Sequence, residues 1–290
     1  MRDLARVLIF TAAAVAVYGQ TPPAPGSLIS IYGSDLAAGL TTADTIPLSA
    51  PTIAAGGVVN GASFQSGLVP GSWITIKGSN LSPVAQDTWD KAIVNGVLPT
   101  SLDGVTVNVG SKLAFVYFIS PGQINAQAPD VGAGPVPVTV TTPGGTSVAF
   151  TANITAQSPA FFLWPGNQAV ATRQDGSLAV KDGTFPGATT VAAKPGDVLI
   201  LWGTGFGPTT PPVAAGIQVP GDKIYNASPV SVTIGTATAQ VFGAALSPGY
   251  AGLYQVAIQV PASMADGDYA LKAAVSGASS PDGVILTVKK

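Results

Sequence analysis

The residues of this sequence that could do chemistry are aromatic and amide side chains rather than ionisable ones. Trp89 lies in a polar stretch between two aspartates, and Gln123, Asn125 and Gln127 recur at every second position. An aromatic ring can stack on the apolar face of a sugar, and amide groups can hydrogen-bond its hydroxyls. These four residues are therefore candidate ligand-binding residues. The plainer alternatives are a structural tryptophan in a loop and a solvated face of a strand.

The composition removes most catalytic and metal-binding chemistry. The 290 residues contain no His and no Cys, and all 14 acidic residues are Asp. A Ser-His-Asp triad, a Cys nucleophile and the usual ligands of zinc, iron–sulfur clusters and haem are therefore excluded. We predict no enzymatic activity, no catalytic residue, no cofactor and no bound metal. An Asp-based or Ser/Lys-based hydrolase stays open as the weakest alternative.

Charge is sparse and shows no pattern. Charged residues make up 9% of the chain, the formal net charge is −2, and the only arginines are Arg2, Arg6 and Arg173. A protein that binds nucleic acid needs a cluster of basic residues to neutralise phosphates. We therefore expect no nucleic-acid partner.

The first residues are typical of a secretory signal peptide. Arg2 and Arg6 precede the apolar run Val7–Val17, and small or tolerated residues lie just before Gln20. A charged start, a short apolar run and a small-residue cleavage site define such a signal. The run is well short of the roughly 20 residues that span a membrane. We predict a signal peptide at 1–19, a secreted, extracellular or cell-surface location, and no membrane span after cleavage.

One sequence motif occurs three times. The copies are PGSWITIKGSNL at Pro70–Leu81, PGDVLILWGTGF at Pro195–Phe206 and PGSLISIYGSDL at Pro25–Leu36. The first two copies continue in step, because Val105–Gly110 matches Val230–Gly235 and Gln123–Pro129 matches Gln255–Pro261. Several matched segments in the same order predict two homologous domains and an orphan third copy of the opening strand.

Each matched segment alternates apolar and polar residues, as Val105, Val107 and Val109 do, which is the pattern of a β-strand. The 35 Gly and 25 Pro residues supply the turns between many short strands. Gly78 and Gly203 end their strands and are expected to allow a bend or bulge. The predicted fold class is all-β, with two tandem Ig-like β-sandwich domains joined by a short structured hairpin connector.

The predicted domain organisation follows from these repeats. It comprises a signal peptide at 1–19, an orphan repeat fragment or linker at 20–57, a sandwich at 58–156, a connector with a hairpin around Asp175-Gly176 at 157–194, and a sandwich at 195–290. The orphan copy Pro25–Leu36 is either the relic of a truncated third domain or a spare strand. A spare strand would allow self-association by pairing with an open sheet edge.

Five motifs carry a resemblance to a known family. They are PGSxIxIxGSNL at Pro70–Leu81, LPTSLDGV at Leu98–Val105, SPGQINxQAP at Ser120–Pro129, WGTGFGP at Trp202–Pro208 and LYQVxIQVP at Leu253–Pro261. The pattern resembles the Solibacter uncharacterised C-terminal domain family of exported acidobacterial proteins, over roughly Gly57 to Lys290. Its opening also resembles, more weakly, the IPT/TIG immunoglobulin-like domains. The resemblance implies export and IPT/TIG-like β-sandwiches, and it implies no catalytic residues.

Three functions stay open from the sequence. The first is an exported, non-enzymatic structural or adhesive protein whose partner is an unknown protein or polysaccharide at the cell surface. The second is a carbohydrate-binding accessory module that uses Trp89, Gln123, Asn125 and Gln127. The third is the Asp-based or Ser/Lys-based hydrolase. Exposed aromatic rings in a groove would favour the second, and converging Asp side chains in a deep pocket the third.

Overall fold

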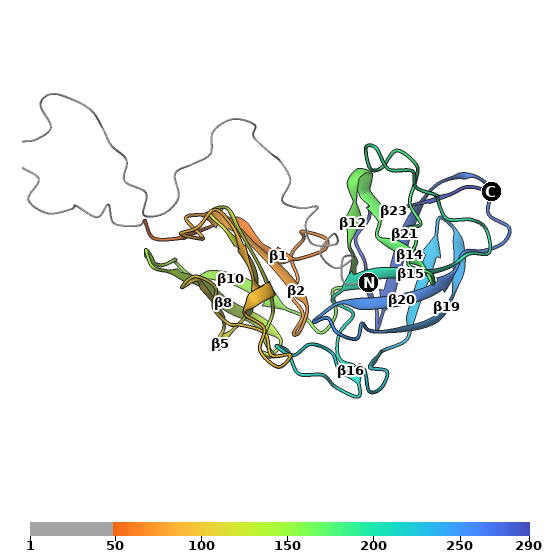
Figure 1. Cartoon of the computed structure of the whole chain (residues 1–290). Coiled ribbons are helices and arrows are strands. Elements are labelled where there is room, and N and C mark those ends of the chain that lie inside the picture. The colour runs from red at the N-terminus through yellow and green to blue at the C-terminus, as the bar shows by residue number, and fades with distance from the viewer. Residues whose placement is uncertain (1–48) are drawn as a thin grey trace, which may run out of the picture.

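The structure, a computed structural model, describes residues 49–290. The predicted signal peptide at 1–19 and the motif copy Pro25–Leu36 lie outside the described residues. Residues 49–290 form an all-β fold with two short 3₁₀ turns, η1 (Trp89–Lys91) and η2 (Pro165–Asn167). Figure 1 shows two groups of strands side by side, one for each predicted sandwich. The predicted all-β class is confirmed.

The first group of strands is a sandwich of two five-stranded sheets. One sheet has the order β1 (Thr52–Asn60), β2 (Trp73–Ser79), β7 (Gln123–Gln127), β6 (Phe115–Ser120) and β3 (Asp87–Thr88). The other has the order β10 (Phe150–Ile154), β8 (Gly134–Thr142), β4 (Thr106–Val109) and β5 (Lys112–Leu113), with β9 (Gly145–Thr146) beside β8. Ile74 and Ile76 of β2 share one buried cluster with Val138 and Val140 of β8. The two sheets therefore enclose the first core.

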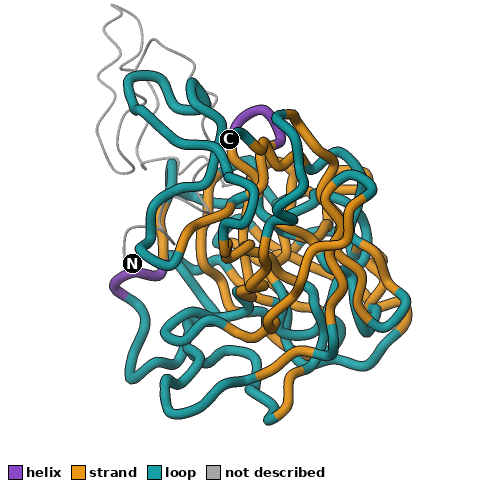
Figure 2. Tube along the Cα trace, turned by 90° about the vertical axis from the view of Figure 1, so that its right-hand side faces the viewer, coloured by secondary structure: helices purple, strands orange, loops and turns teal. Residues whose placement is uncertain are grey.

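The second group is one network of thirteen strands. Its main path runs through β11 (Ala160–Phe161), β15 (Val198–Thr204), β20 (Tyr254–Gln259), β19 (Ala237–Leu246), β18 (Val230–Ile234), β21 (Gly267–Val275), β23 (Ile285–Val288), β13 (Gln168–Ala169) and β12 (Leu163–Trp164). The side strands are β14 (Ala171–Arg173), β16 (Thr209–Thr210), β17 (Asn226–Ala227) and β22 (Ala278–Ser279). Leu199, Leu201, Val256 and Ile258 lie in the second core. Figure 2 views the molecule from this side and shows long loops between the strands.

Both groups repeat one pairing pattern. The equivalent antiparallel pairs are β2–β7 and β15–β20, β6–β7 and β19–β20, β4–β8 and β18–β21, and β8–β10 and β21–β23. The matched sequence segments thus take matching places in the two sheets. This is the arrangement expected of a duplicated unit, and it supports the tandem fold predicted from the sequence.

The motif glycines allow neighbouring strands to approach closely. A Cβ atom on Gly78 would collide with the carbonyl oxygen of Thr52 in β1, and one on Gly203 with that of Ala160 in β11. The expected bulge lies in the neighbouring strand, because the register of β1 on β2 shifts between Ile53 and Val58. Equivalent glycines therefore perform the same steric task in both copies.

The segment 157–194 is structured. Its apolar residues between 160 and 170 form a layer between the two sandwiches, which we call the wall. Phe162, Trp164 and Val170 belong to the buried cluster of the first sandwich, where Phe162 and Trp164 lie on the Trp73 side of its first sheet, whereas Phe161 and Ala169 pack into the second core. Successive side chains of a strand point to opposite faces, so a short strand pair can bury one face in each core. This explains the run of apolar residues from 160 to 164. The predicted structured connector is confirmed.

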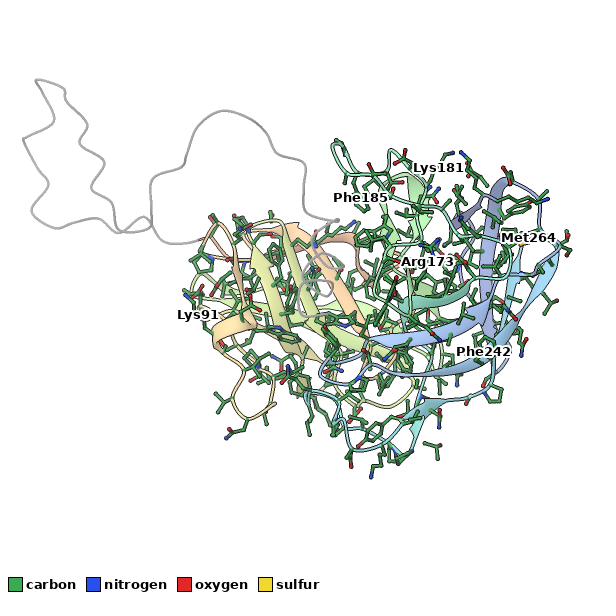
Figure 3. The ribbon with its side chains drawn as sticks, turned by 45° about the vertical axis from the view of Figure 1, so that its right-hand side comes forward. Lys91, Arg173, Lys181, Phe185, Phe242 and Met264 are labelled. Carbon is green, nitrogen blue, oxygen red and sulfur yellow. The ribbon has the colours of Figure 1, made fainter. Side chains whose placement is uncertain are left out.

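Polar contacts fix the rest of this connector, including the predicted hairpin. Thr172 bridges Leu178 across the Asp175-Gly176 turn. Arg173, labelled in Figure 3, donates from Nε to Asp197 Oδ2 at 3.0 Å and from Nη1 to the Leu178 carbonyl at 2.9 Å. A guanidinium held by several acceptors orders the loops that supply them.

A second polar contact joins the connector to the last two long strands. Lys181 Nζ lies 2.8 Å from Asp268 Oδ2, and the Thr287 hydroxyl lies 2.6 Å from Asp268 Oδ1. These hydrogen bonds, the one from Lys181 first, hold the pKa of the Asp268 carboxyl below its ordinary value. The ionised carboxylate therefore stabilises this corner of the fold.

We expect Asp268→Asn to flatten the acid limb of the stability curve. The folded-state pKa lies below the unfolded one, so the contribution is complete above about pH 4 and is lost as the pH falls through the folded pKa. The measurement is the free energy of unfolding from urea titrations across roughly pH 2 to pH 7. Asp282→Asn is the control, because Asp282 pairs with Lys272 at a largely exposed site. Identical acid limbs for wild type and Asp268→Asn would contradict this account.

Gly205 and Gly176 have similar backbone angles. Alanine variants at these two positions therefore separate the cost of the left-handed conformation from the cost of a steric overlap. Gly205 has φ +79° and Gly176 has φ +83°. Only at Gly205 would a Cβ overlap the Ser158 carbonyl oxygen, whereas nothing lies within 4 Å at Gly176. Both alanine variants incur about 1–2 kcal/mol for the left-handed conformation. Gly205→Ala should lower the free energy of unfolding by clearly more than Gly176→Ala, as measured by chemical denaturation, and equal losses would argue against the close approach.

Candidate functional site

Three of the predicted ligand-binding residues, Gln123, Asn125 and Gln127, lie on one face of the first sheet. This face is turned away from the first core. Along β7 and β2, Gln123 pairs with Lys77, Asn125 with Thr75, and Gln127 with Trp73. The intervening residues Ile124 and Ala126 are fully buried in the first core. The amides therefore form a polar row, as period-2 alternation predicts. This outer face is largely covered by the connector and by the second group of strands.

Trp89 lies in an aromatic cluster with Trp73 and Tyr117 on the same face. Its ring centroid is 5.4 Å from that of Trp73 and 4.8 Å from that of Tyr117, with tilted and edge-on geometry. Such pairs add about 0.5–1.5 kcal/mol each beyond the area they bury. Trp89 is 8% exposed, so its ring is occupied by protein neighbours. Its role in binding a ligand stays a prediction.

Gln127 bridges the two groups of strands. Its Nε2 donates to the Gly71 carbonyl at 2.8 Å, and its Oε1 accepts from the Gly216 backbone N–H at 2.8 Å. Nearby, the Trp73 indole N–H donates to the Ala251 carbonyl at 2.8 Å. The Gln127 amide is buried and bonded at both ends, which places it in the interface between the two sandwiches. Its role in binding a ligand stays a prediction.

Thr204 completes this interface. The Thr204 hydroxyl accepts a hydrogen bond from the Trp73 backbone N–H at 3.0 Å and donates one to the Gly252 carbonyl at 2.8 Å. The side chain is fully buried. A single hydroxyl thus satisfies one backbone group from each sandwich, and neither group has access to water in its place.

Asn125 has one amide atom paired and the other free. Its Oδ1 accepts from the Thr75 hydroxyl and from Gln123 Nε2, both at 2.9 Å. Two donors converge on this atom, which fixes the orientation of the amide. Its Nδ2 donates no hydrogen bond to any of residues 49–290. Asn125 is 7% exposed and lines a pocket, so the free donor lies at a cavity rather than in bulk solvent. Gln123 holds this amide in place.

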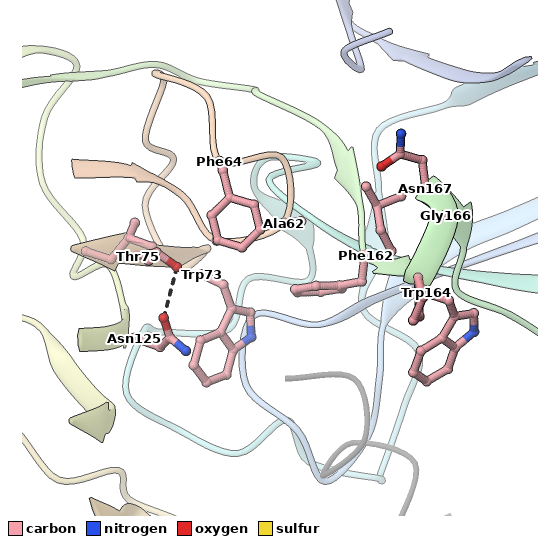
Figure 4. Close-up of a pocket in the computed structure, with 13 residues that line it drawn as sticks. Ala62, Phe64, Trp73, Thr75, Asn125, Phe162, Trp164, Gly166 and Asn167 are labelled. Carbon is pink, nitrogen blue, oxygen red and sulfur yellow. Dashed lines mark hydrogen bonds between the residues drawn. The ribbon is translucent and has the colours of Figure 1, made fainter. Parts of the chain in front are cut away.

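The pocket beside Asn125 lies between the first sheet and the segment 162–167 of the connector (Figure 4). Its volume is about 380 Å³. The aromatic lining residues are Phe64, Trp73, Phe162 and Trp164, and the polar side chains are Thr75, Asn125 and Asn167. None of the lining residues is ionisable. The site is therefore an uncharged aromatic pocket with a few hydrogen-bonding groups.

Both rims of this pocket are tight turns. Phe64 has φ +56° and is 37% exposed, and Asn167 opposite has φ +59° beside Gly166 at φ +73°. An aromatic residue seldom adopts a left-handed conformation, and such residues cluster at ligand sites. Lys77 Nζ lies 4.5 Å from the centroid of the Phe64 ring, which adds a cation–π contact.

Asn60 holds the Phe64 turn in place. Its Oδ1 accepts from the backbone N–H groups of Ala62 and Ser63 at 2.9 and 3.2 Å, and its Nδ2 donates to the Ser158 carbonyl at 3.0 Å. Asn60 is fully buried. The rim is thus fixed to the connector before any ligand arrives, which is the condition for a preorganised site.

Two further cavities have different character. A cavity of about 750 Å³ between the sandwiches is lined mostly by apolar residues, and it includes Tyr254, which is bonded through its hydroxyl to the Gly207 carbonyl. Burial raises the pKa of this Tyr254 hydroxyl. A third, of about 420 Å³, lies beside Arg173 and Phe185. Trp164 packs edge-on against Phe185, and its indole N–H is buried without a partner in the described part of the chain.

Two features are absent from residues 49–290. No group of three or more acidic side chains is placed to hold a metal ion. None of the helical segments in this part of the chain is long and apolar enough to cross a membrane.

Of the residues that line the aromatic pocket, Asn125 is among the candidates predicted from the sequence, whereas Phe64, Phe162 and Trp164 are not. The run of apolar residues from 160 to 164 was a usable signal, because a strand with no polar face must be buried on both sides. No comparable signal exists for Phe64. Its position depends on a turn that Asn60 and Ser158 fix from distant parts of the chain.

Comparisons with known proteins agree with the fold. The model of the IPT/TIG domain matches residues 59–160, which confirms the Ig-like resemblance for that part of the chain. The resemblance to the Solibacter family stays a prediction. No curated protein matches the chain.

Solved structures resemble the chain distantly. SGBP-B of the Bacteroides ovatus mixed-linkage glucan utilization locus, in complex with a mixed-linkage heptasaccharide, is 14% identical with a TM-score of 0.33, over 82% of this chain and 46% of that chain. Domains 5–6 of the S-layer protein SbsC are 12% identical with a TM-score of 0.27, over 82% of this chain and 98% of that one. The chain thus spans less than half of the first protein. At these identities and scores, neither likeness indicates what this chain binds.

Proposed function

We propose that the protein is an exported, non-catalytic structural or adhesive module that acts at or beyond the cell surface. Its domains would be the sandwiches at 58–156 and 195–290 with the connector at 157–194. Its partner would be a protein or a polysaccharide of the cell surface. The observation that carries the proposal is the buried interface at Thr204, which bonds a backbone group of each sandwich and which we expect to hold the two as one rigid body.

The interface differs from a flexible linker between independent domains. Besides Thr204, backbone hydrogen bonds join Leu98 to Gly216 at 2.9 Å and Gln218 to Gly96 at 2.8 Å. Interfaces between domains of one chain ordinarily permit relative motion unless they are large and apolar. Here the shared wall of Phe161 and Phe162 adds apolar contact on both sides. A fixed angle suits a module that transmits load or presents loops at set positions.

The absence of His, Cys and Glu from the whole sequence supports a non-catalytic role. The ionisable groups of the described part are held mainly at the surface, where pairs such as Lys272–Asp282 are solvated. No pair of Asp side chains lines the aromatic pocket. The hydrolase alternative therefore gains no support from this site.

Removing one hydroxyl tests the rigid unit. Thr204→Val keeps the shape of the side chain but leaves the Trp73 N–H and the Gly252 carbonyl unpaired. We expect the free energy of unfolding to fall by about 1–3 kcal/mol for each unpaired group. We also expect the wild type to unfold in a single calorimetric transition and the variant in a broadened or split one. Small-angle X-ray scattering should give a profile that one rigid structure fits for the wild type and only an ensemble fits for the variant.

Thr151→Val is the matched control, because Thr151 is exposed in β10 and should tolerate the loss of its hydroxyl. A Thr204→Val protein as stable and as rigid as the control would contradict the proposed unit. So would a wild-type protein that scatters as two independently moving domains.

Export has its own test. The full chain, expressed in a bacterium with a tag at its C-terminus, is expected outside the cytoplasm with Gln20 as its first residue, within a few positions. Mass spectrometry of the purified protein gives the cleavage position, and cell fractionation gives the location. An uncleaved chain in the cytoplasm would argue against an extracellular role. Blocking the charged start with Arg2→Asp and Arg6→Asp should retain precursor in the cell.

A further inference from the structure

The pocket beside Asn125 contains a hydrogen-bond donor that no group of residues 49–290 accepts from. Thr75 and Gln123 both donate to Asn125 Oδ1, so the Nδ2 group is fixed in direction and free to donate. Figure 4 shows this nitrogen on the side of the amide that faces the Trp73 ring. A polar group at a largely buried position needs a partner, and here a ligand oxygen can supply it.

The rest of the lining selects the kind of ligand. Phe64, Trp73 and Phe162 present ring surfaces, which suit an apolar face. No lining residue is ionisable, and the Lys77 ammonium at the rim lies over the Phe64 ring, so a charged group inside the pocket would lose its hydration without a counter-charge among the lining residues. A purely apolar ligand would leave Asn125 Nδ2 unpaired. A neutral molecule with one apolar face and several hydroxyls satisfies both requirements, and a sugar ring is such a molecule.

The volume sets the size of the ligand. Pockets that bind small ligands measure about 300–1,000 Å³, and this one is about 380 Å³. It therefore has room for one or two sugar rings rather than for a long groove-bound chain. Because the Phe64 turn is fixed through Asn60, little order has to be created on binding.

The duplicated half of the protein provides an internal comparison. Thr75 pairs with Asn125 between β2 and β7, and the equivalent pair between β15 and β20 is Ile200 with Ala257. The same strand positions therefore carry a polar pair in one copy and an apolar pair in the other. A sandwich of this type does not need the polar pair to fold, so the Thr75–Asn125 pair calls for an explanation specific to the first copy.

We propose that this pocket binds a neutral sugar residue of a cell-surface or environmental polysaccharide, with the ring stacked on the aromatic wall and a hydroxyl accepting from Asn125 Nδ2. The proposal rests on the non-catalytic binding role proposed above and names the class of its ligand. It differs from a site built on Trp89, because the rings that face the pocket are Phe64, Trp73 and Phe162.

Two substitutions test the pocket without removing its supports. Asn125→Asp keeps an oxygen that accepts from Thr75 and Gln123 but replaces the free donor with a second carboxylate oxygen. Phe64→Ala removes the exposed ring at the rim. Phe242→Ala is the matched control, because Phe242, labelled in Figure 3, is 54% exposed on β19 of the second group of strands and does not line the pocket. Thermal unfolding of each variant checks that the fold is retained.

The measurement is affinity gel electrophoresis of the purified protein through gels that contain neutral polysaccharides (β-glucan, mannan, galactan, arabinoxylan) or acidic ones (alginate, polygalacturonate). We expect retardation by at least one neutral polysaccharide and by no acidic one. Asn125→Asp and Phe64→Ala should weaken it by about tenfold or more, a change equivalent to one lost contact, while Phe242→Ala should bind as the wild type does. Isothermal calorimetry with the matching oligosaccharide gives the dissociation constants.

Several outcomes would overturn the proposal. These are no retardation by any neutral polysaccharide, retardation by acidic ones alone, or neutral binding that both folded pocket variants retain. In those cases, a single rigid body in scattering would leave the proposed structural or adhesive role standing without this ligand. Shortening of the bound polysaccharide during incubation would instead overturn the non-catalytic role and keep the pocket.

Discussion

The structure depends on a strand pair that buries both of its faces. Phe161 and Ala169 belong to the second core, whereas Phe162, Trp164 and Val170 belong to the buried cluster of the first sandwich. Burying each large apolar side chain contributes about 1.5–3 kcal/mol relative to leaving it in water. Separating the two sandwiches would therefore expose apolar surface from two cores at once. Successive side chains of this strand pair alternate between the two sandwiches. The relative position of the sandwiches follows from that alternation more than from any surface contact.

Once this wall is in place, the polar groups around it have to be satisfied locally. Thr204, Gln127 and Asn60 are buried, and each bonds groups that belong to different parts of the chain. A buried polar group with no partner costs about 1–3 kcal/mol. Only a relative placement of the two sandwiches and the connector that pairs these side chains avoids that cost. These side chains strengthen a packing that the apolar wall has already selected. At the pocket, residues 162–167 of the connector face the outer side of the first sheet but leave a cavity between them.

Much of this architecture could be predicted from the sequence, because it follows from local rules. Period-2 alternation gives the strands, Asp175-Gly176 gives the hairpin, and the repeat of PGSWITIKGSNL as PGDVLILWGTGF gives the duplicated pairing. The polar row Gln123, Asn125 and Gln127 on one face is likewise a local consequence. What covers that face could not be predicted, since it depends on residues such as Gly216 and Ala251, far away in the chain. Trp89 illustrates the limit, because its loop position gave no sign of the rings that enclose it.

The pocket and the interface are physically linked, because the two sides of the pocket come from different parts of the chain. Phe64, Trp73 and Asn125 belong to the first sandwich, whereas Phe162 and the turn at Asn167 belong to the connector, which pairs with strands of the second. A ligand that touches both sides binds the assembled form and not a form in which they have separated. By mass action it stabilises the assembled form by RT ln(1 + [L]/Kd). Ligand binding and rigidity therefore reinforce each other, and a protein that holds a polysaccharide under load would gain stiffness where the load is applied.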